Sequence, residues 1–111
     1  MYLPKKDIYD LLKTITKNVS QTQPTVFNSL PYLTFAIVDN YTNVDLDNTI
    51  LSQDIEVKID IWAESSVEAS QLLSSLEEVM RGDNWRLVYS ADVPNIGDIF
   101  HTVTRFRKIV G

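Results

Sequence analysis

The sequence contains no cysteine, which excludes disulfide bonds, thiol catalysis and cysteine-based zinc sites together. Its three glycines, Gly82, Gly97 and Gly111, lie too far apart to form a phosphate-binding loop. His101 is the only histidine, and a zinc site needs several nitrogen or sulfur ligands. We therefore interpret His101 as an exposed or sheet-edge residue, and we expect no metal and no cofactor.

Long apolar runs and an excess of basic residues are also missing. No window is apolar for long enough to cross a bilayer, and the first residues lack the apolar centre of a signal peptide. The formal net charge of -5 argues against tight, non-specific nucleic-acid binding, which needs a surface of lysine and arginine. With 111 residues, 44% of them hydrophobic, the chain fits a single folded domain over residues 1–111. We expect it to be made in the cytoplasm, without membrane contact.

The clearest pattern runs from Asp54 to Gly82. Isoleucine and valine alternate with polar residues up to Trp62, which predicts a half-buried strand. Ser65 and Glu68 then form a capping-box pattern at a helix start. Leucines, valine and methionine follow at helical spacing, and we expect Gly82 to provide the left-handed exit from this helix.

The remaining elements follow the same periodicities. A helix is predicted over Pro4–Val19, and we interpret Asp39–Gln53 and Ala91–Gly97 as irregular connections, the first being an extended hairpin tip or a mobile arm. Further strands are predicted at Tyr32–Val38, Trp85–Tyr89 and Phe100–Val110. The order α-β-β-α-β-β predicts an α+β fold with two layers: an antiparallel sheet of about four strands with both helices on one face.

No pattern in the sequence specifies an active site. Asp45, Asp47, Thr49 and Glu56 match part of a calcium-loop spacing, but isoleucine replaces the required glycine, so a solvated acidic loop is the better interpretation. The basic residues of the last strand, Arg105, Arg107 and Lys108, are typical of a charged strand edge.

Aromatic and aliphatic side chains at polar positions suggest an interface instead. Tyr41, Val44 and Leu46 lie in the long polar connection, and Trp62 has the opposite parity to the buried isoleucines. Such residues favour protein–protein contact. For Trp62, packing against a loop or against the first helix is an equal alternative.

Three segments together carry a resemblance. They are Leu30-Pro31-Tyr32 after an N-terminal helix, Ile59-Asp60-Ile61-Trp62-Ala63-Glu64-Ser65-Ser66 before the second helix, and His101-Thr102-Val103-Thr104-Arg105-Phe106 in the closing strand. In this layout the chain resembles the small tail-terminator and tail-completion (head–tail joining) proteins of long-tailed bacteriophages.

The resemblance implies a structural, non-enzymatic protein of the virion, located at the junction of head and tail. It implies an α+β domain that assembles with itself into a ring, a hexamer, at the head-proximal end of the tail tube. The implied partners are the tail tube protein and the head connector protein, with DNA passing through the channel without tight binding. A net acidic ring agrees with such passage, because like charges repel.

Two alternatives of other classes stay open. One is a small non-enzymatic adaptor that binds a protein through the Tyr41–Leu46 loop. The other is a small enzyme whose site is assembled from Asp39, Asp45, Asp60 and His101.

Overall fold

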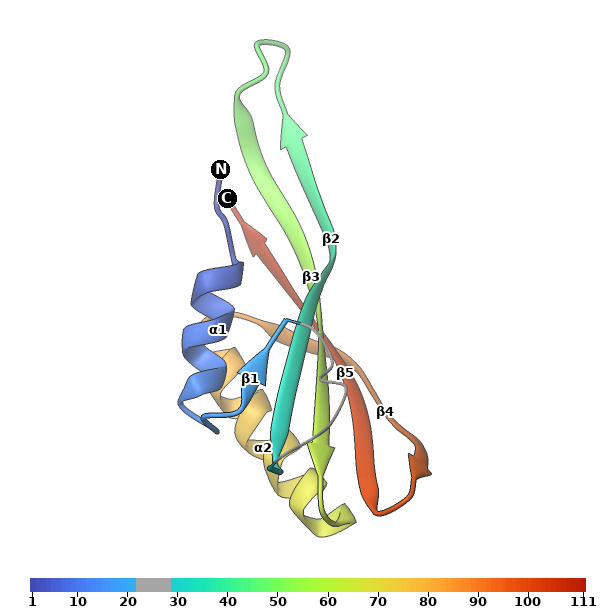
Figure 1. Cartoon of the computed structure of the whole chain (residues 1–111). Helices are drawn as coiled ribbons and strands as arrows, with labels where there is room; N and C mark the ends of the chain where they lie inside the picture. The colour runs from blue at the N-terminus through green and yellow to red at the C-terminus, as the bar shows by residue number, and fades with distance from the viewer. Residues whose placement is uncertain (22–28) are drawn as a thin grey trace.

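A two-layer α+β architecture is seen in the computed structural model, which describes residues 1–21 and 29–111, with the backbone alone for residues 95 and 96. Within these residues the chain forms two helices and one five-stranded sheet, with strand order β1-β2-β3-β5-β4 (Figure 1). The strands are antiparallel apart from the parallel pair β1 and β2. The elements are α1 (Lys5–Lys13), β1 (Val19–Ser20), β2 (Tyr32–Val44), β3 (Ile50–Ala63), α2 (Ser66–Gly82), β4 (Arg86–Ile96) and β5 (Ile99–Val110).

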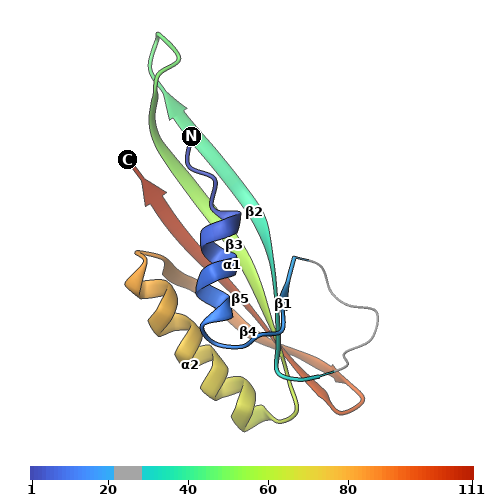
Figure 2. The same ribbon diagram turned by 60° about the vertical axis from the view of Figure 1, so that its left-hand side comes forward.

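Both helices cover the same face of the sheet, as the two ribbon views show (Figures 1 and 2). We call this the helix face and the opposite one the open face. The predicted fold class is confirmed. The sequence did not indicate β1, which is only two residues long and pairs with Leu33 and Thr34 at the start of β2.

The core lies between the helices and the middle strands. Ile55, Val57, Ile59 and Ile61 of β3 are completely buried on the helix face, as their alternation predicts. They pack in one cluster with side chains from both helices and from the strand β5. These are Ile8, Leu12, Leu76, Met80 and Phe106. Burying each such side chain stabilises the fold by about 1.5–3 kcal/mol, so this cluster is the main source of stability.

The predicted start of α2 is confirmed by its hydrogen bonds. The Ser65 hydroxyl accepts from the Glu68 amide at 3.1 Å, and the Glu68 carboxylate accepts from the Glu64 amide at 3.1 Å. The predicted exit at Gly82 is wrong. Gly82 is the last helical residue, and Asn84 takes the left-handed conformation with φ of 67°.

The first helix is shorter than Pro4–Val19. It ends at Lys13, where the Thr14 hydroxyl donates to the Leu11 carbonyl at 2.6 Å and competes with helical bonding. Val19 is buried as predicted, but it belongs to β1, because pairing with Leu33 places it in the core.

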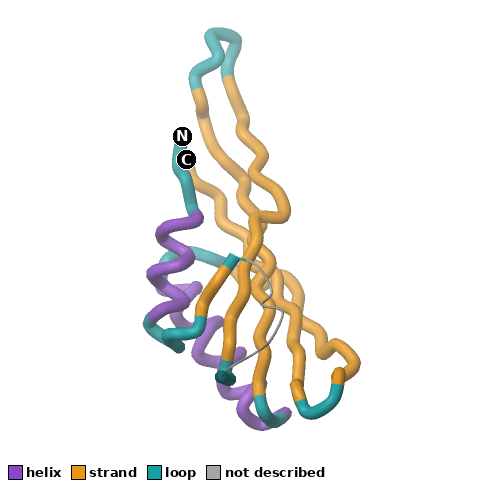
Figure 3. Tube along the Cα trace, viewed as in Figure 1, coloured by secondary structure: helices purple, strands orange, loops and turns teal. Residues whose placement is uncertain are grey.

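The two irregular connections are mostly strand. Pairing of β2 with β3 continues to Val44 and Ile50, so the Asp39–Gln53 stretch is an extended hairpin, one of the alternatives that its length left open. The Ala91–Gly97 stretch continues β4 to Ile96, and Gly97 makes the turn with φ of 64°. The hairpin formed by residues 39–53, here called the arm, projects beyond the helices (Figure 3) and gives the molecule extents of 53 × 25 × 25 Å.

Candidate functional site

The end of the arm is a defined turn rather than a loose loop. The Asp45 carboxylate accepts from the backbone amides of Asp47 and Thr49, both at 2.9 Å. The backbone of Asp45 also bonds to Asn48 and Thr49, and Asn48 has a φ of 63°, which asparagine tolerates well. We call residues 45–49 the tip. Its hydrogen bonds hold Leu46 outward, with a relative exposure of 103%.

Three of the four residues predicted as an interface lie on the arm and are exposed. Tyr41 is 61% exposed, Val44 50%, and Leu46 completely. These values describe a free surface in the single chain, and use of that surface as an interface stays a proposal.

The fourth residue, Trp62, is not on this surface. It lies on the open face, as its parity predicts, but is only 6% exposed. Its indole N–H donates to the Thr34 hydroxyl at 3.2 Å, and its ring stacks on His101 with the centroids 3.7 Å apart. Trp62 is therefore not an exposed residue, because side chains of the flanking strands β2 and β5 contact it. Its use as an interface stays a prediction.

His101 is likewise neither exposed nor at a sheet edge, which corrects its interpretation. Strand β5 runs between β3 and β4, and His101 lies opposite Trp62 with its side chain 16% exposed. Its Nε2 atom faces Asp60 Oδ1 at 3.7 Å. Among the described residues neither atom has a hydrogen-bond partner, although both are buried.

The electrostatics of this pair favour a neutral imidazole. Burial lowers the pKa of His101, and this effect exceeds the opposing attraction of the Asp60 carboxylate. The 3.7 Å separation is too long for a direct hydrogen bond, so we treat the attraction as purely electrostatic. Lys58 lies 3.5 Å from the same carboxylate and partly neutralises it.

The structure does not assemble the four-residue enzyme site. It brings Asp60 and His101 together, but Asp39 lies at the base of the arm, opposite Glu56 in the strand register, and Asp45 lies at the tip. The partial calcium spacing does not converge either, because Arg105 contacts Glu56 and backbone amides occupy the Asp45 carboxylate. Within residues 1–21 and 29–111 there is no group of three or more metal-binding side chains. Neither of the two described helices is long and apolar enough to span a membrane.

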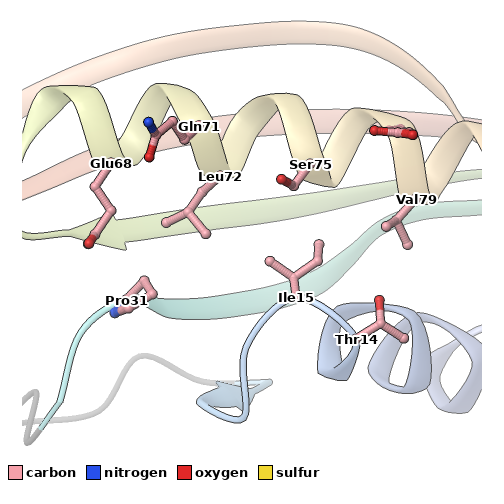
Figure 4. Close-up of a pocket in the computed structure, with 9 residues that line it drawn as sticks. Thr14, Ile15, Pro31, Glu68, Gln71, Leu72, Ser75 and Val79 are labelled. Carbon is pink, nitrogen blue, oxygen red and sulfur yellow. The ribbon is translucent and has the colours of Figure 1, made fainter.

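Among the hollows that the described residues form on the helix side, two involve the first helix or the segment before it. One lies between α1 and α2, where Leu72 and Val79 point toward Thr14 and Ile15 (Figure 4). The other, here called the arm-base pocket, lies where the N-terminal segment runs beside β2. Its lining consists of Leu3, Pro4, Lys5, Lys6, Ile37 and Asn40.

Sequence reasoning missed the arm-base pocket. Its residues come from two segments more than thirty positions apart, and no local pattern links them. One signal was present: Leu3 is an apolar residue ahead of the helix with two lysines following, and it is 72% exposed.

Comparison with known proteins shows a similar fold in a solved structure. No family model matches the sequence, and no curated protein matches it. Among solved structures, a chain from the virion of a native gene transfer agent (GTA) particle is similar, with a TM-score of 0.59. That chain is 15% identical, and the alignment covers 93% of this chain and 83% of that one. The two chains share a fold, and the other is part of a virion.

Proposed function

We propose that this protein is a structural phage morphogenesis protein: a tail-terminator or head–tail joining subunit that forms a ring at the head-proximal end of the tail tube. One observation carries the proposal, namely a paired hairpin arm with exposed apolar side chains. It projects from the rest of the described chain, here called the body. The shared fold with a chain of a GTA virion supports it. We assign the protein to the virion and propose no catalytic role.

The arm supplies a reason for self-association. Tyr41, Val44 and Leu46 expose apolar surface on a hairpin that buries little of it within its own chain. A surface of this kind is typical of a contact with another protein. If the arm meets a different patch on its neighbour, the contact is head-to-tail and closes into a ring when the rotation allows. We propose a hexamer, as the resemblance to tail terminators implies.

The proposed partners are the tail tube protein, the head connector protein and other copies of this chain. DNA would pass through the ring without tight binding, and the charges support this. The arginines of the last strand are paired, Arg105 with Glu56 and Arg107 with Asp54, so they offer little free positive charge to phosphates. The net charge of -5 acts in the same direction.

The test is electron microscopy of the protein mixed with tail tubes of its own phage. We expect rings at tube ends and tubes of limited length. The variant Leu46→Asp should lose capping, whereas Val67→Asp should keep it, because Val67 is 65% exposed but belongs to α2. Uncapped tubes of unlimited length with the wild-type protein, at concentrations that also show no ring, would reject the proposal.

The adaptor hypothesis is the second candidate, and the same arm favours it. A monomer that presents Tyr41 and Leu46 is suited to binding one protein partner. Molar mass in solution and on tail tubes separates the two, since an adaptor stays monomeric in both.

A further inference from the structure

We infer that the tip of one copy inserts Leu46 into the arm-base pocket of a neighbouring copy, with Asp47 facing Lys5 and Lys6. This inference rests on the proposed self-association and names both halves of the contact. It depends on four properties of the described residues: a preformed tip, a preformed pocket, opposite charges, and a distance that one chain cannot bridge.

The tip is preorganised to act as a plug. Leu46 is completely exposed, yet four backbone and carboxylate hydrogen bonds around Asp45 fix the turn that carries it. A rigid presentation lowers the entropy cost of binding. Asp47 flanks the leucine, so the plug is apolar at its centre and acidic at its rim.

The arm-base pocket has the complementary character. Leu3, Pro4 and Ile37 provide apolar walls, and Lys5 and Lys6 stand at the rim. The Lys6 ammonium contacts Asp10 at 3.0 Å, but this pair is exposed on the helix surface and therefore weak. Asp7, the other nearby carboxylate, accepts from the Tyr2 hydroxyl.

Gln53 holds the pocket in place. Its side chain accepts from the Tyr2 amide at 2.7 Å, and it donates to the Tyr2 carbonyl at 3.1 Å and to Asn40 at 3.2 Å. With 3% exposure, Gln53 fixes the N-terminal segment against the arm. The pocket therefore exists before any partner arrives.

The plug cannot reach the pocket of its own chain. From Ile37 to Val44 the chain runs as extended strand, at roughly 3.3 Å per residue, so the tip begins about 23 Å away. Pairing with β3 up to Val44 and Ile50 prevents the arm from folding back. A second copy of the chain is the occupant that combines this acidic, apolar plug with a basic, apolar pocket.

Disulfide cross-linking tests the contact directly, because the chain has no cysteine of its own. The variant carrying both Leu46→Cys and Leu3→Cys, oxidised at concentrations where the wild-type protein self-associates and also on tail tubes, should give covalent multimers on a non-reducing gel. The matched control combines Leu46→Cys with Val67→Cys on α2 and should remain monomeric on that gel. Both Leu3 and Val67 are exposed, at 72% and 65%, so neither substitution threatens folding.

Charge exchange tests the rim. Asp47→Lys alone should raise the concentration needed for half-maximal self-association by roughly tenfold, as should Lys5→Glu with Lys6→Glu. Combining all three changes should restore association. Asp45 is left unchanged because it holds the turn.

The outcomes separate this inference from the proposed function. Rings that cap tail tubes without any Leu46–Leu3 cross-link would overturn the contact and leave the function standing. Cross-linked dimers that never cap a tube would support the contact and reject the ring. Absence of cross-links under every condition overturns the inference.

Discussion

The body and the arm are built from the same strands but held together differently. In the body, alternate residues of β3 such as Ile59 and Ile61 are completely buried under the helices. In the arm, the same strand continues as Ile50 and Leu51, which are 40% and 59% exposed. The body is stabilised by burial, whereas the arm depends on backbone pairing and the hydrogen bonds of its tip. Within the single chain, the arm therefore contributes little apolar burial to stability.

The largest expected effect contrasts one leucine from each region. Leu76→Ala in the body should lower the free energy of unfolding by about 2–5 kcal/mol, because it leaves a cavity under α2. Leu46→Ala at the tip should change it by less than about 0.5 kcal/mol. Urea unfolding of both variants measures the difference. Similar losses for the two would show that the arm is part of the cooperative core.

The strands and helices of the body were largely predictable, because local sequence patterns there indicate which side chains are buried. The alternation in β3 and the Ser65–Glu68 pair each specify an element without reference to the rest of the chain. The strands of the arm were not predictable in this way. Neither face of the arm is buried, so its apolar and polar residues do not alternate, and its polar composition is typical of a loop. Its hairpin character was only one of two alternatives.

The site was predicted in part. The exposure of Tyr41, Val44 and Leu46 agrees with the sequence interpretation. On the open face, Trp62 and His101 are less exposed than the sequence suggested. The burial of Trp62 and His101 depends on which strands flank β3, and the strand order was not predictable from the sequence. The arm-base pocket depends in the same way on tertiary structure, because Leu3 and Ile37 line it from two segments that are distant in the sequence.

A second prediction concerns Gln53, where body and arm meet. Gln53→Met keeps the volume but leaves the Tyr2 amide and carbonyl without their partner. We expect a loss of about 1–2 kcal/mol in unfolding free energy. Gln71→Met on the exposed surface of α2 is the control and should have little effect. If the two variants unfold alike, the N-terminal segment is not fixed by this contact, and the pocket is less rigid than we infer.

The smallest expected effect is a pH dependence from the open face of the body. The pKa of His101 is lowered in the folded protein from its ordinary value of 6.5, chiefly because of burial. The unfolded chain therefore binds more protons as the pH falls below that value. The contribution of His101 to stability is complete above the unfolded pKa and is lost as the pH falls through the folded one.

The variant His101→Phe can stack on Trp62 but does not titrate, so it isolates this effect. Between about pH 5 and pH 8, the wild-type protein should lose stability on acidification relative to the variant. Asp60 and Lys58 of β3 are the charged groups that act on His101, and the Asp60 attraction opposes the loss. If stability instead rises as the pH falls, that attraction outweighs burial and the pair closes into an ion pair. Added salt should screen exposed charges of the arm such as Asp47. It should screen the interaction between Asp60 Oδ1 and His101 Nε2 much less, because these two atoms are buried.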